Sequence, residues 1–306
     1  MTVSNLIVFD GTEEYPSADA QRRLASLVGI DDQRERLAKG LRLMLDPESV
    51  SAWSKRHHGE ILPIVQFFKE RPPLFILAGD VGTGKTALAE SIGDTVARDS
   101  GIHVTLYRMS LASRGTGLVG EITKLVSGAF GEVAAAAKKT KNPGKHRGAH
   151  ILLVDEADAL AQTRESAQMH HEDRAGVNAL IRGVDEFSSQ HLPAAVIMCT
   201  NRLNAIDPAV RRRAADVLEF ARPGDEQRRL ILAAALKPAG FNAHQIEALV
   251  EATGAAQEPG FTYSDLTQRL LPALVLDAYP DKPIKFERAL ELVVKTKPTP
   301  KFSEAQ

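Results

Sequence analysis

The sequence predicts an α/β fold, in which a parallel sheet is flanked by helices and followed by a small all-helical domain. Between residues 74 and 222, apolar runs of strand length alternate with helical segments, which is typical of a parallel sheet covered on both faces. A glycine-rich loop directly follows the first of these runs. After Pro223 the apolar strands stop, and residues 223–294 show amphipathic helices separated by turn-rich segments.

The individual elements can be placed from the same pattern. Residues 1–73 are expected to form a short strand and then helical segments, with Leu37, Leu41, Met44 and Leu45 as a core-facing stripe at helical spacing. The strands of the sheet are expected at residues 74–78, 104–109, 150–154, 194–200 and 217–220. The chain thus divides into an N-terminal segment (1–73), an α/β domain (74–222), a helical lid domain (223–294) and a flexible tail (295–306).

The composition excludes several classes of protein. The chain has 306 residues, 43% of them hydrophobic, which is ample for a packed core. Its net charge of −1 does not favour nucleic acid or an acidic membrane as a partner. The single cysteine, Cys199, excludes an intrachain disulfide framework. We expect a cytoplasmic protein, because no apolar stretch reaches the length of a membrane span or of a signal peptide.

Residues 79–86, GDVGTGKT, match the phosphate-binding motif G-x-x-x-x-G-K-[ST] in full. The motif has the context that it needs, between a strand at 74–78 and a helix expected over 87–97. Lys85 is expected to reach the β- and γ-phosphates of ATP, and Thr86 to bind Mg²⁺. The backbone that wraps the phosphates belongs to Gly79, Asp80, Val81, Gly82, Thr83 and Gly84.

A pair of carboxylates, Asp155 and Glu156, follows the buried strand at 150–154. A carboxylate at the end of a strand beside a phosphate-binding loop is placed to bind Mg²⁺, so Asp155 takes that role. Glu156 is placed to orient and deprotonate the attacking water. The alternative is a helix cap, because acidic residues are also favoured in a first helical turn. The complete phosphate-binding motif upstream favours the catalytic interpretation.

Polar residues also follow the later strands. Asn201 comes directly after the strand at 194–200, where its amide could hold the attacking water or the γ-phosphate; a simple turn residue is the alternative. Arg211, Arg212 and Arg213 come next, and guanidinium groups suit the charge of a phosphoryl group in transfer. An arginine supplied by a neighbouring subunit would make hydrolysis depend on assembly. A salt-bridge cluster without a catalytic role is the alternative.

The basic run KKTKNPGKHR at 138–147 is the segment that favours contact with nucleic acid. No aromatic residues interleave with its lysines for base stacking, so a solvated loop is the favoured interpretation.

In this order, GDVGTGKT, ILLVDEADAL, CTNR, IDPAVRRRAADVLEF and an all-helical lid resemble the AAA+ ATPase family. The resemblance spans about residues 28–277 and places Gly29 and Ile30 against the adenine of ATP. It implies a homohexameric ring, hydrolysis of Mg·ATP at the subunit interfaces, and conformational work on a partner. By the family pattern, Arg212 and Arg213 match the fingers that act on a neighbour's ATP. The family's lid arginine has no clear counterpart, because the expected position near residue 266 reads Ser264-Asp265-Leu266; Arg269 is the alternative nearby.

The finer resemblance is to the pachytene-checkpoint ATPases, which remodel HORMA-domain proteins. GLVGEITKLVSGAF at 117–130 is similar to their substrate-gripping pore loop and its helix, with Leu118 and Val119 where the family typically presents aromatic residues. GVNALIRGVDEF at 176–187 is similar to the helix after their second pore loop. The compact length resembles the bacterial members, which accompany a HORMA protein and a second-messenger nucleotidyltransferase in CBASS antiphage systems.

The resemblance therefore implies an ATP-driven ring that disassembles an activated HORMA complex, with or without the nucleotidyltransferase. The alternative is a nucleic-acid motor or loader of the clamp-loader or transposition-helper type. The neutral chain and the absence of a recognisable DNA-binding module in the sequence disfavour that alternative.

Overall fold

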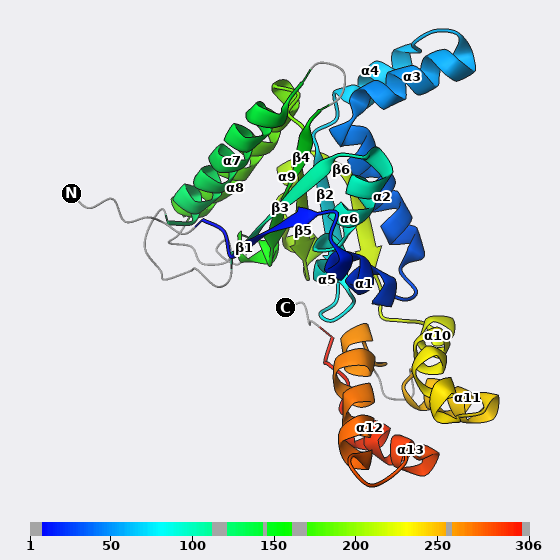
Figure 1. The fold of residues 1–306 in the computed structure, drawn as a ribbon. Coiled ribbons are helices and arrows are strands. Elements are labelled where there is room, and N and C mark those ends of the chain that lie inside the picture. The colour runs from blue at the N-terminus through cyan, green and yellow to red at the C-terminus, as the bar shows by residue number, and fades with distance from the viewer. Residues whose placement is uncertain (1–7, 112–120, 143–145, 161–169, 255–258, 302–306) are drawn as a thin grey trace. The chain divides into compact units, whose positions relative to one another are not determined.

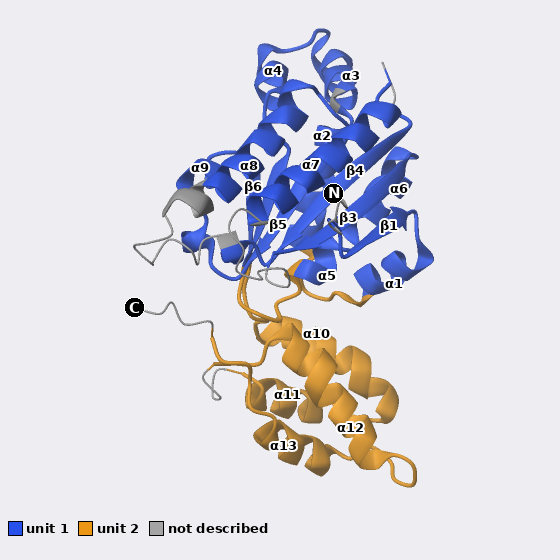
Figure 2. Ribbon diagram, turned by 90° about the vertical axis from the view of Figure 1, so that its left-hand side faces the viewer, with its two compact units in different colours: residues 1–25, 32–78, 86–219 blue, residues 26–31, 79–85, 220–306 orange. Residues whose placement is uncertain are grey.

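The computed structural model describes residues 8–111, 121–142, 146–160, 170–254 and 259–301 (Figure 1). The chain divides into two compact units, shown in different colours in Figure 2. Residues 1–25, 32–78 and 86–219 form the sheet unit, and residues 26–31, 79–85 and 220–306 form the helical unit. The predicted α/β fold with a following helical region is confirmed, whereas the bounds of the four predicted segments stay a prediction.

The described residues form one six-stranded sheet with the order β1-β3-β4-β5-β2-β6. Strands β3, β4, β5 and β2 pair in parallel, as predicted, and β1 lies antiparallel to β3 at the edge. All five predicted strands are present. The strands are β1 (Gly11–Tyr15), β2 (Leu74–Gly79), β3 (His103–Ser110), β4 (Gly148–Asp155), β5 (Ala194–Thr200) and β6 (Ala214–Phe220).

The central strands are buried on both faces. Helices α7 (Glu121–Thr140) and α8 (His170–Ser189) cover one face, and α2 (Asp31–Leu45) and α6 (Ile92–Ser100) cover the other (Figure 1). Along β2, Leu74 and Ile76 join the core on the side of α7 and α8. Phe75 faces α2 so closely that a Cβ added to Gly40 would stand 2.6 Å from its ring. Because both faces are covered, these strands are continuous apolar runs without the alternation of a half-exposed strand.

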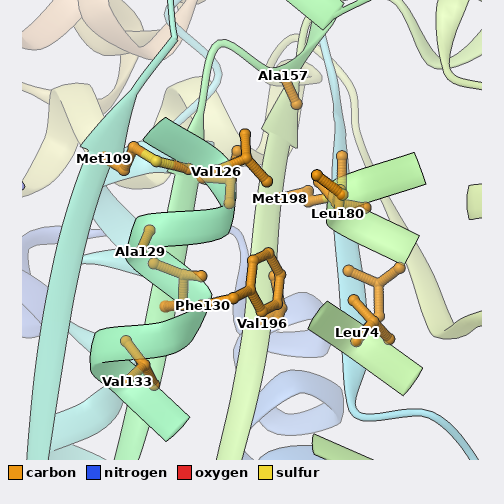
Figure 3. Close-up of a cluster of buried hydrophobic side chains, with 14 of the residues drawn as sticks. Leu74, Met109, Val126, Ala129, Phe130, Val133, Ala157, Leu180, Val196 and Met198 are labelled. Carbon is orange, nitrogen blue, oxygen red and sulfur yellow. The ribbon is translucent and has the colours of Figure 1, made fainter. Parts of the chain in front are cut away.

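The core between the sheet and α7 and α8 is closely packed (Figure 3). The rings of Phe130 in α7 and Phe187 in α8 lie 5.2 Å apart. A Cβ on Gly183 would stand 2.2 Å from the Phe130 ring, so α8 can approach α7 only with glycine at this position. Figure 3 shows the side chains around Phe130, among them Leu74, Val126, Ala129, Val133, Leu180, Val196 and Met198.

The single helix predicted over 87–97 is two helices, α5 (Lys85–Ala89) and α6, which begins at Ile92. Glu90 lies at the break. Its carboxylate accepts a hydrogen bond from Arg108 Nη1 at 2.7 Å, and its carbonyl accepts one from the Tyr15 hydroxyl. The Asp94 amide then bonds to the Ser91 carbonyl at 3.1 Å. The first helix ends here because the Glu90 carbonyl is bonded to the edge strand.

The predicted stripe in α2 is buried at Leu37, Leu41 and Leu45, and Met44 is half-buried. In the ranges that the structure describes, no helix has the length and apolar character required to cross a membrane. The other helices of this part of the chain are α1 (Ala18–Ser26), α3 (Pro47–His58), α4 (Pro63–Lys69) and α9 (Pro208–Arg211).

The helical unit has a core of its own, formed by α10 (Asp225–Leu236), α11 (Ala243–Ala252), α12 (Leu271–Ala278) and α13 (Phe286–Lys295). Helix α11 begins with a capping box, in which Asn242 and Gln245 each accept a backbone N–H of the other at 2.9 Å. Leu232, Leu249 and Phe261 are fully buried between the helices.

The buried Asp265 holds part of the segment predicted to be a flexible tail. Thr299 donates to its carboxylate through Oγ1 at 2.7 Å and through its backbone N–H at 3.0 Å. Burial by itself would raise the pKa of Asp265. Hydrogen bonds from Thr262, Thr299 and Arg269 outweigh it and lower the pKa to about 2. The chain is therefore anchored at residue 299, because its polar groups satisfy a buried carboxylate.

The buried His150 in β4 predicts a loss of stability in mild acid. It is 5% exposed, and its Nε2 lies 2.9 Å from Thr140 Oγ1. Burial lowers its pKa from 6.5 to about 4, so the unfolded chain takes up a proton at higher pH than the folded chain. Stability from this residue is complete above pH 6.5 and falls as the pH decreases towards 4. Between pH 7 and pH 5 the free energy of unfolding should fall by about 2 kcal/mol.

Urea unfolding of the wild type and of His150→Gln at these two pH values checks this prediction. The variant lacks the titrating ring and should lose about 2 kcal/mol less than the wild type between the two conditions. Equal losses in both proteins would show that His150 does not control the acid sensitivity.

Candidate active site

The phosphate-binding loop leaves β2 at Gly79 and is held by hydrogen bonds of its own. Thr83 Oγ1 donates to the Asp80 carbonyl at 2.8 Å. Lys85 is 6% exposed, and its ammonium donates to the carbonyls of Gly79 and Asp80, both at 2.8 Å. The loop thus concentrates positive charge at the end of β2, at the start of α5.

Within the helical unit, to which the loop belongs, Gly82 contacts residues 262–264. Gly82 has φ of 74°, a left-handed conformation that side chains rarely adopt. Its carbonyl accepts a hydrogen bond from Ser264 N at 3.0 Å, and an added Cβ would stand 2.9 Å from Thr262 Oγ1 and Ser264 Cβ. The glycine is therefore required both by the turn and by the close approach of residues 262–264.

Gly82→Val is expected to weaken nucleotide binding by about tenfold or more, because valine neither adopts this φ nor fits beside Thr262 without moving the loop. Titration with a fluorescent ATP analogue measures the effect. Val81→Ala is the matched control, because it shortens an exposed side chain of the same loop and should bind like the wild type. Unchanged affinity of Gly82→Val would show that the contact with Thr262 does not shape the loop.

The Asp80 side chain is bound to an arginine that the sequence analysis missed. Arg222 donates to Asp80 Oδ2 from Nε at 2.8 Å and from Nη2 at 2.6 Å. Its Nη1 also donates to the Gly260 carbonyl at 2.7 Å. Both side chains are largely buried, so the pair anchors the loop to the chain that follows β6. The side chain of Asp80 is thus engaged by Arg222, and the backbone of Asp80 remains the candidate for phosphate binding.

The segment predicted to contact adenine, around Gly29 and Ile30, belongs to the helical unit. The Gly29 carbonyl accepts a hydrogen bond from Gln227 Nε2 of α10, and the Ser26 carbonyl accepts one from the Tyr263 hydroxyl. Gly29 has φ of 82°, and Ile30 is half-buried. The helical unit therefore holds both the predicted adenine segment and the phosphate-binding loop through its own side chains.

In the sheet unit, Thr86 and Asp155 lie together as predicted. Thr86 Oγ1 is 3.4 Å from Asp155 Oδ1, which also accepts the Glu156 N–H at 2.9 Å. Burial is the largest cause of the raised pKa of Asp155. A hydroxyl and a carboxylate oxygen are ligands that Mg²⁺ prefers, so the pair fits the predicted metal site.

Glu156 follows β4 with φ of 52°, which is uncommon for a residue other than glycine and recurs at functional sites. Its Oε2 accepts a hydrogen bond from Ser110 Oγ at 2.7 Å. Ser110 is the last residue of β3 and lies opposite Asp155 in the parallel register. The carboxylate is therefore held by the neighbouring strand. Sequence reasoning missed Ser110, although its place at a strand end was a usable signal.

Asn201 leaves β5 beside the end of β4, and a buried aspartate fixes this turn. Asp158 Oδ1 accepts hydrogen bonds from Thr200 Oγ1 and from Asn201 N, both at 3.3 Å. Asp158 is 6% exposed and lies in a short helix directly after Glu156. It was not among the predicted site residues, yet it ties the Asn201 backbone to the strand that ends in Asp155.

The two predicted arginine fingers differ in their surroundings. Arg213 forms a bidentate pair with Asp185 of α8, at 2.9 Å from Nε and 3.1 Å from Nη2, and also donates to the Ala209 carbonyl. Arg212 is exposed and has no ion-pair partner among the residues that the structure describes. The structure therefore leaves the Arg212 guanidinium exposed, whereas Arg213 is engaged within its own chain.

Comparison with known proteins identifies the family. Residues 75–222 match the ATPase family associated with various cellular activities (AAA). CD-NTase-associated protein 6 of Escherichia coli (strain MS 115-1) is 54% identical over 302 residues, which cover 98% of this chain and 97% of that protein. The chain belongs to this family of AAA ATPases.

Two solved structures resemble the ATPase along its length. A chain in the E. coli MS115-1 HORMA:CdnC:Trip13 complex matches it with a TM-score of 0.89 and 53% identity, covering 96% of the ATPase and 97% of that chain. Rhizobiales Trip13 matches with a TM-score of 0.75 and 47% identity, covering 95% and 99%. The predicted AAA+ membership and the finer resemblance to Trip13-like proteins are confirmed, so the ATPase binds and hydrolyses a nucleotide.

Two further predictions for the ATPase concern the pore loop and the basic run at 138–147. The pore-loop residues Leu118 and Val119 lie outside the described residues, which resume at Glu121. In the basic run, Lys138 pairs with Glu186 at 3.3 Å and Lys141 donates to the Gln190 carbonyl at 2.6 Å. These lysines contact α8 and the residue that follows it in their own chain, which weighs against the nucleic-acid alternative.

Proposed function

We propose that this ATPase forms a homohexameric ring that uses Mg·ATP to remodel a HORMA-domain protein. The observation that carries the proposal is the match, with a TM-score of 0.89 over 96% of the chain, to a structure of a HORMA:CdnC:Trip13 complex. The partners are then a HORMA-domain protein and a nucleotidyltransferase of the CD-NTase class. The ring would disassemble their activated complex in the cytoplasm, as part of CBASS antiphage defence.

The phosphate-binding loop and the end of β4 supply the groups that bind Mg·ATP. Lys85 can exchange its two loop carbonyls for phosphate oxygens, because an ammonium forms stronger hydrogen bonds with charged acceptors. Thr86 and Asp155 would hold Mg²⁺, which neutralises charge on the β- and γ-phosphates. Gly29 and Ile30 would contact the adenine.

Hydrolysis requires a base, an orienting group and a positive charge near the γ-phosphate. Glu156 would take the proton of the attacking water while Ser110 holds its carboxylate, and Asn201 would orient the water or the phosphate. Arg212 of a neighbouring subunit would stabilise the charge in the transition state. Hydrolysis would then require the assembled ring.

Coupling between ATP hydrolysis and movement of the substrate would start at the phosphate-binding loop. Inside the helical unit, Ser264 and Arg222 contact the loop, and Gln227 contacts the adenine segment. A change of nucleotide therefore acts directly on the helical unit. The pore loop with Leu118 and Val119 would grip a flexible end of the HORMA protein and pull it.

The test uses tagged Glu156→Gln protein with Mg·ATP as a trap in lysate of the native host, followed by mass spectrometry. ATP should stay bound without hydrolysis, so the closed ring should retain its substrate. Recovery of a HORMA-domain protein, absent with Lys85→Ala, would support the proposal. Nuclease-sensitive recovery of DNA-bound proteins would overturn it in favour of the motor or loader.

A further inference from the structure

The edge strand β1 begins close to Ser110, the residue whose hydroxyl donates to the proposed catalytic glutamate. Its ladder with β3 reaches Gly11, which lies opposite Arg108, and the Asp10 N–H donates to the Arg108 carbonyl at 2.8 Å. At Ser110, two residues after Arg108 in β3, the side chain of Asp10 takes the place that a backbone group of β1 takes in the ladder. Its Oδ2 accepts the Ser110 N–H at 2.6 Å.

Ser110 connects this contact to Glu156. Its N–H points to Asp10 on the side of β1, and its Oγ donates to Glu156 Oε2 at 2.7 Å. On the side of β4, the next residue, Leu111, donates its N–H to the Asp155 carbonyl at 3.4 Å. We propose that Asp10 is a positioning residue for Glu156 and acts through Ser110. This inference rests on the proposed role of Glu156 as the base.

The position of Ser110 depends on Asp10 because Ser110 is the last residue of its strand. A hydrogen bond from a backbone N–H to a carboxylate is short and charge-assisted, and the 2.6 Å distance is of that kind. Without it, the end of β3 loses its bond on the side of β1 and the Ser110 hydroxyl can turn away. Glu156 is exposed and has φ of 52°, so Ser110 is the contact that fixes its carboxylate on this side.

Loss of this contact should affect the reaction and leave ATP binding unchanged. A displacement of about 1 Å in a reacting group can lower a rate by as much as about 10²-fold. Asp10→Ala is therefore expected to lower kcat about tenfold, within that bound. The KM for ATP should stay unchanged, because the proposed role of Asp10 is to position the base and not to bind the phosphates.

The experiment measures steady-state ATP hydrolysis and thermal melting of the full-length protein. The variants are Asp10→Ala, Asp10→Asn, Ser110→Ala and the double variant of Asp10→Ala with Ser110→Ala. Each single alanine variant should lose about tenfold in kcat, and the double variant should lose no more than either alone. Asp10→Asn should recover most of the rate, because the amide oxygen can still accept the Ser110 N–H.

Glu14→Ala is the matched control, since Glu14 is an exposed acidic residue of the same strand. A similar loss in this control, a wild-type kcat in Asp10→Ala, or losses that multiply in the double variant would overturn the inference. If an alanine variant melts at a lower temperature, the kcat of Asp10→Asn is the test. A kcat as low as that of Asp10→Ala would show that Asp10 acts through its charge alone and not through the hydrogen bond to Ser110. Glu156→Gln tests the premise separately: if it hydrolyses ATP normally, the proposed role of Glu156 as the base is wrong, whatever the Asp10 variants show.

Discussion

Replacement of Glu156 by glutamine is expected to lower ATP turnover by about 10²- to 10⁴-fold while ATP remains bound. Glutamine has the same size, and its oxygen can still accept the hydrogen bond that Ser110 Oγ now makes at 2.7 Å. It cannot take a proton from water, so the step that needs a base is lost. Phosphate release at saturating ATP measures the rate, and titration with a fluorescent ATP analogue measures binding.

The Lys85→Ala variant is the control for this result. It removes the ammonium that lies within the phosphate-binding loop, so it should lose ATP binding together with turnover. Turnover of Glu156→Gln at the wild-type rate would mean that another group serves as the base. Loss of ATP binding by Glu156→Gln would mean that the carboxylate supports the loop instead.

Replacement of Arg212 by alanine is expected to lower turnover by about 10³-fold or more in the assembled ring. Arg212 is exposed and has no ion-pair partner in the described part of its own chain, which suits the proposed contact with a neighbour's phosphate. Arg213→Ala should differ, because Arg213 pairs with Asp185 of its own chain at 2.9 Å. Its loss should mainly destabilise the junction of α8 and α9.

Mixed rings show in which subunit each arginine acts. Arg212→Ala subunits keep their own Glu156, and Glu156→Gln subunits keep their own Arg212. A mixture of the two should recover part of the activity at interfaces where an intact base meets an intact finger. The matched mixture of Arg213→Ala with Glu156→Gln should recover none if Arg213 serves its own chain. Failure of the first mixture, with rings formed, would contradict a role of Arg212 in a neighbour.

Much of the fold followed from local patterns in the chain. The strands that carry the site are continuous apolar runs, because helices cover both faces of the sheet, and such runs are visible without the structure. The break between α5 and α6 was not predictable. It arises from Tyr15 and Arg108, which contact Glu90 from distant parts of the chain.

In the candidate site, too, some residues could be predicted from the sequence and others are brought in only by the tertiary structure. The phosphate-binding motif and the roles of the Asp155–Glu156 pair could be predicted from the sequence, because each proposed function depends on a short segment at the end of a strand. The groups that hold them come from far along the chain: Arg222 is 142 residues from Asp80, Gln227 is 198 residues from Gly29, and Ser110 is 46 residues from Glu156. Only the pairing of strands and the packing of helices bring these side chains together, so no local pattern could show which residues pair. Of the three supporting residues, Ser110 alone carried a local signal, its place at a strand end.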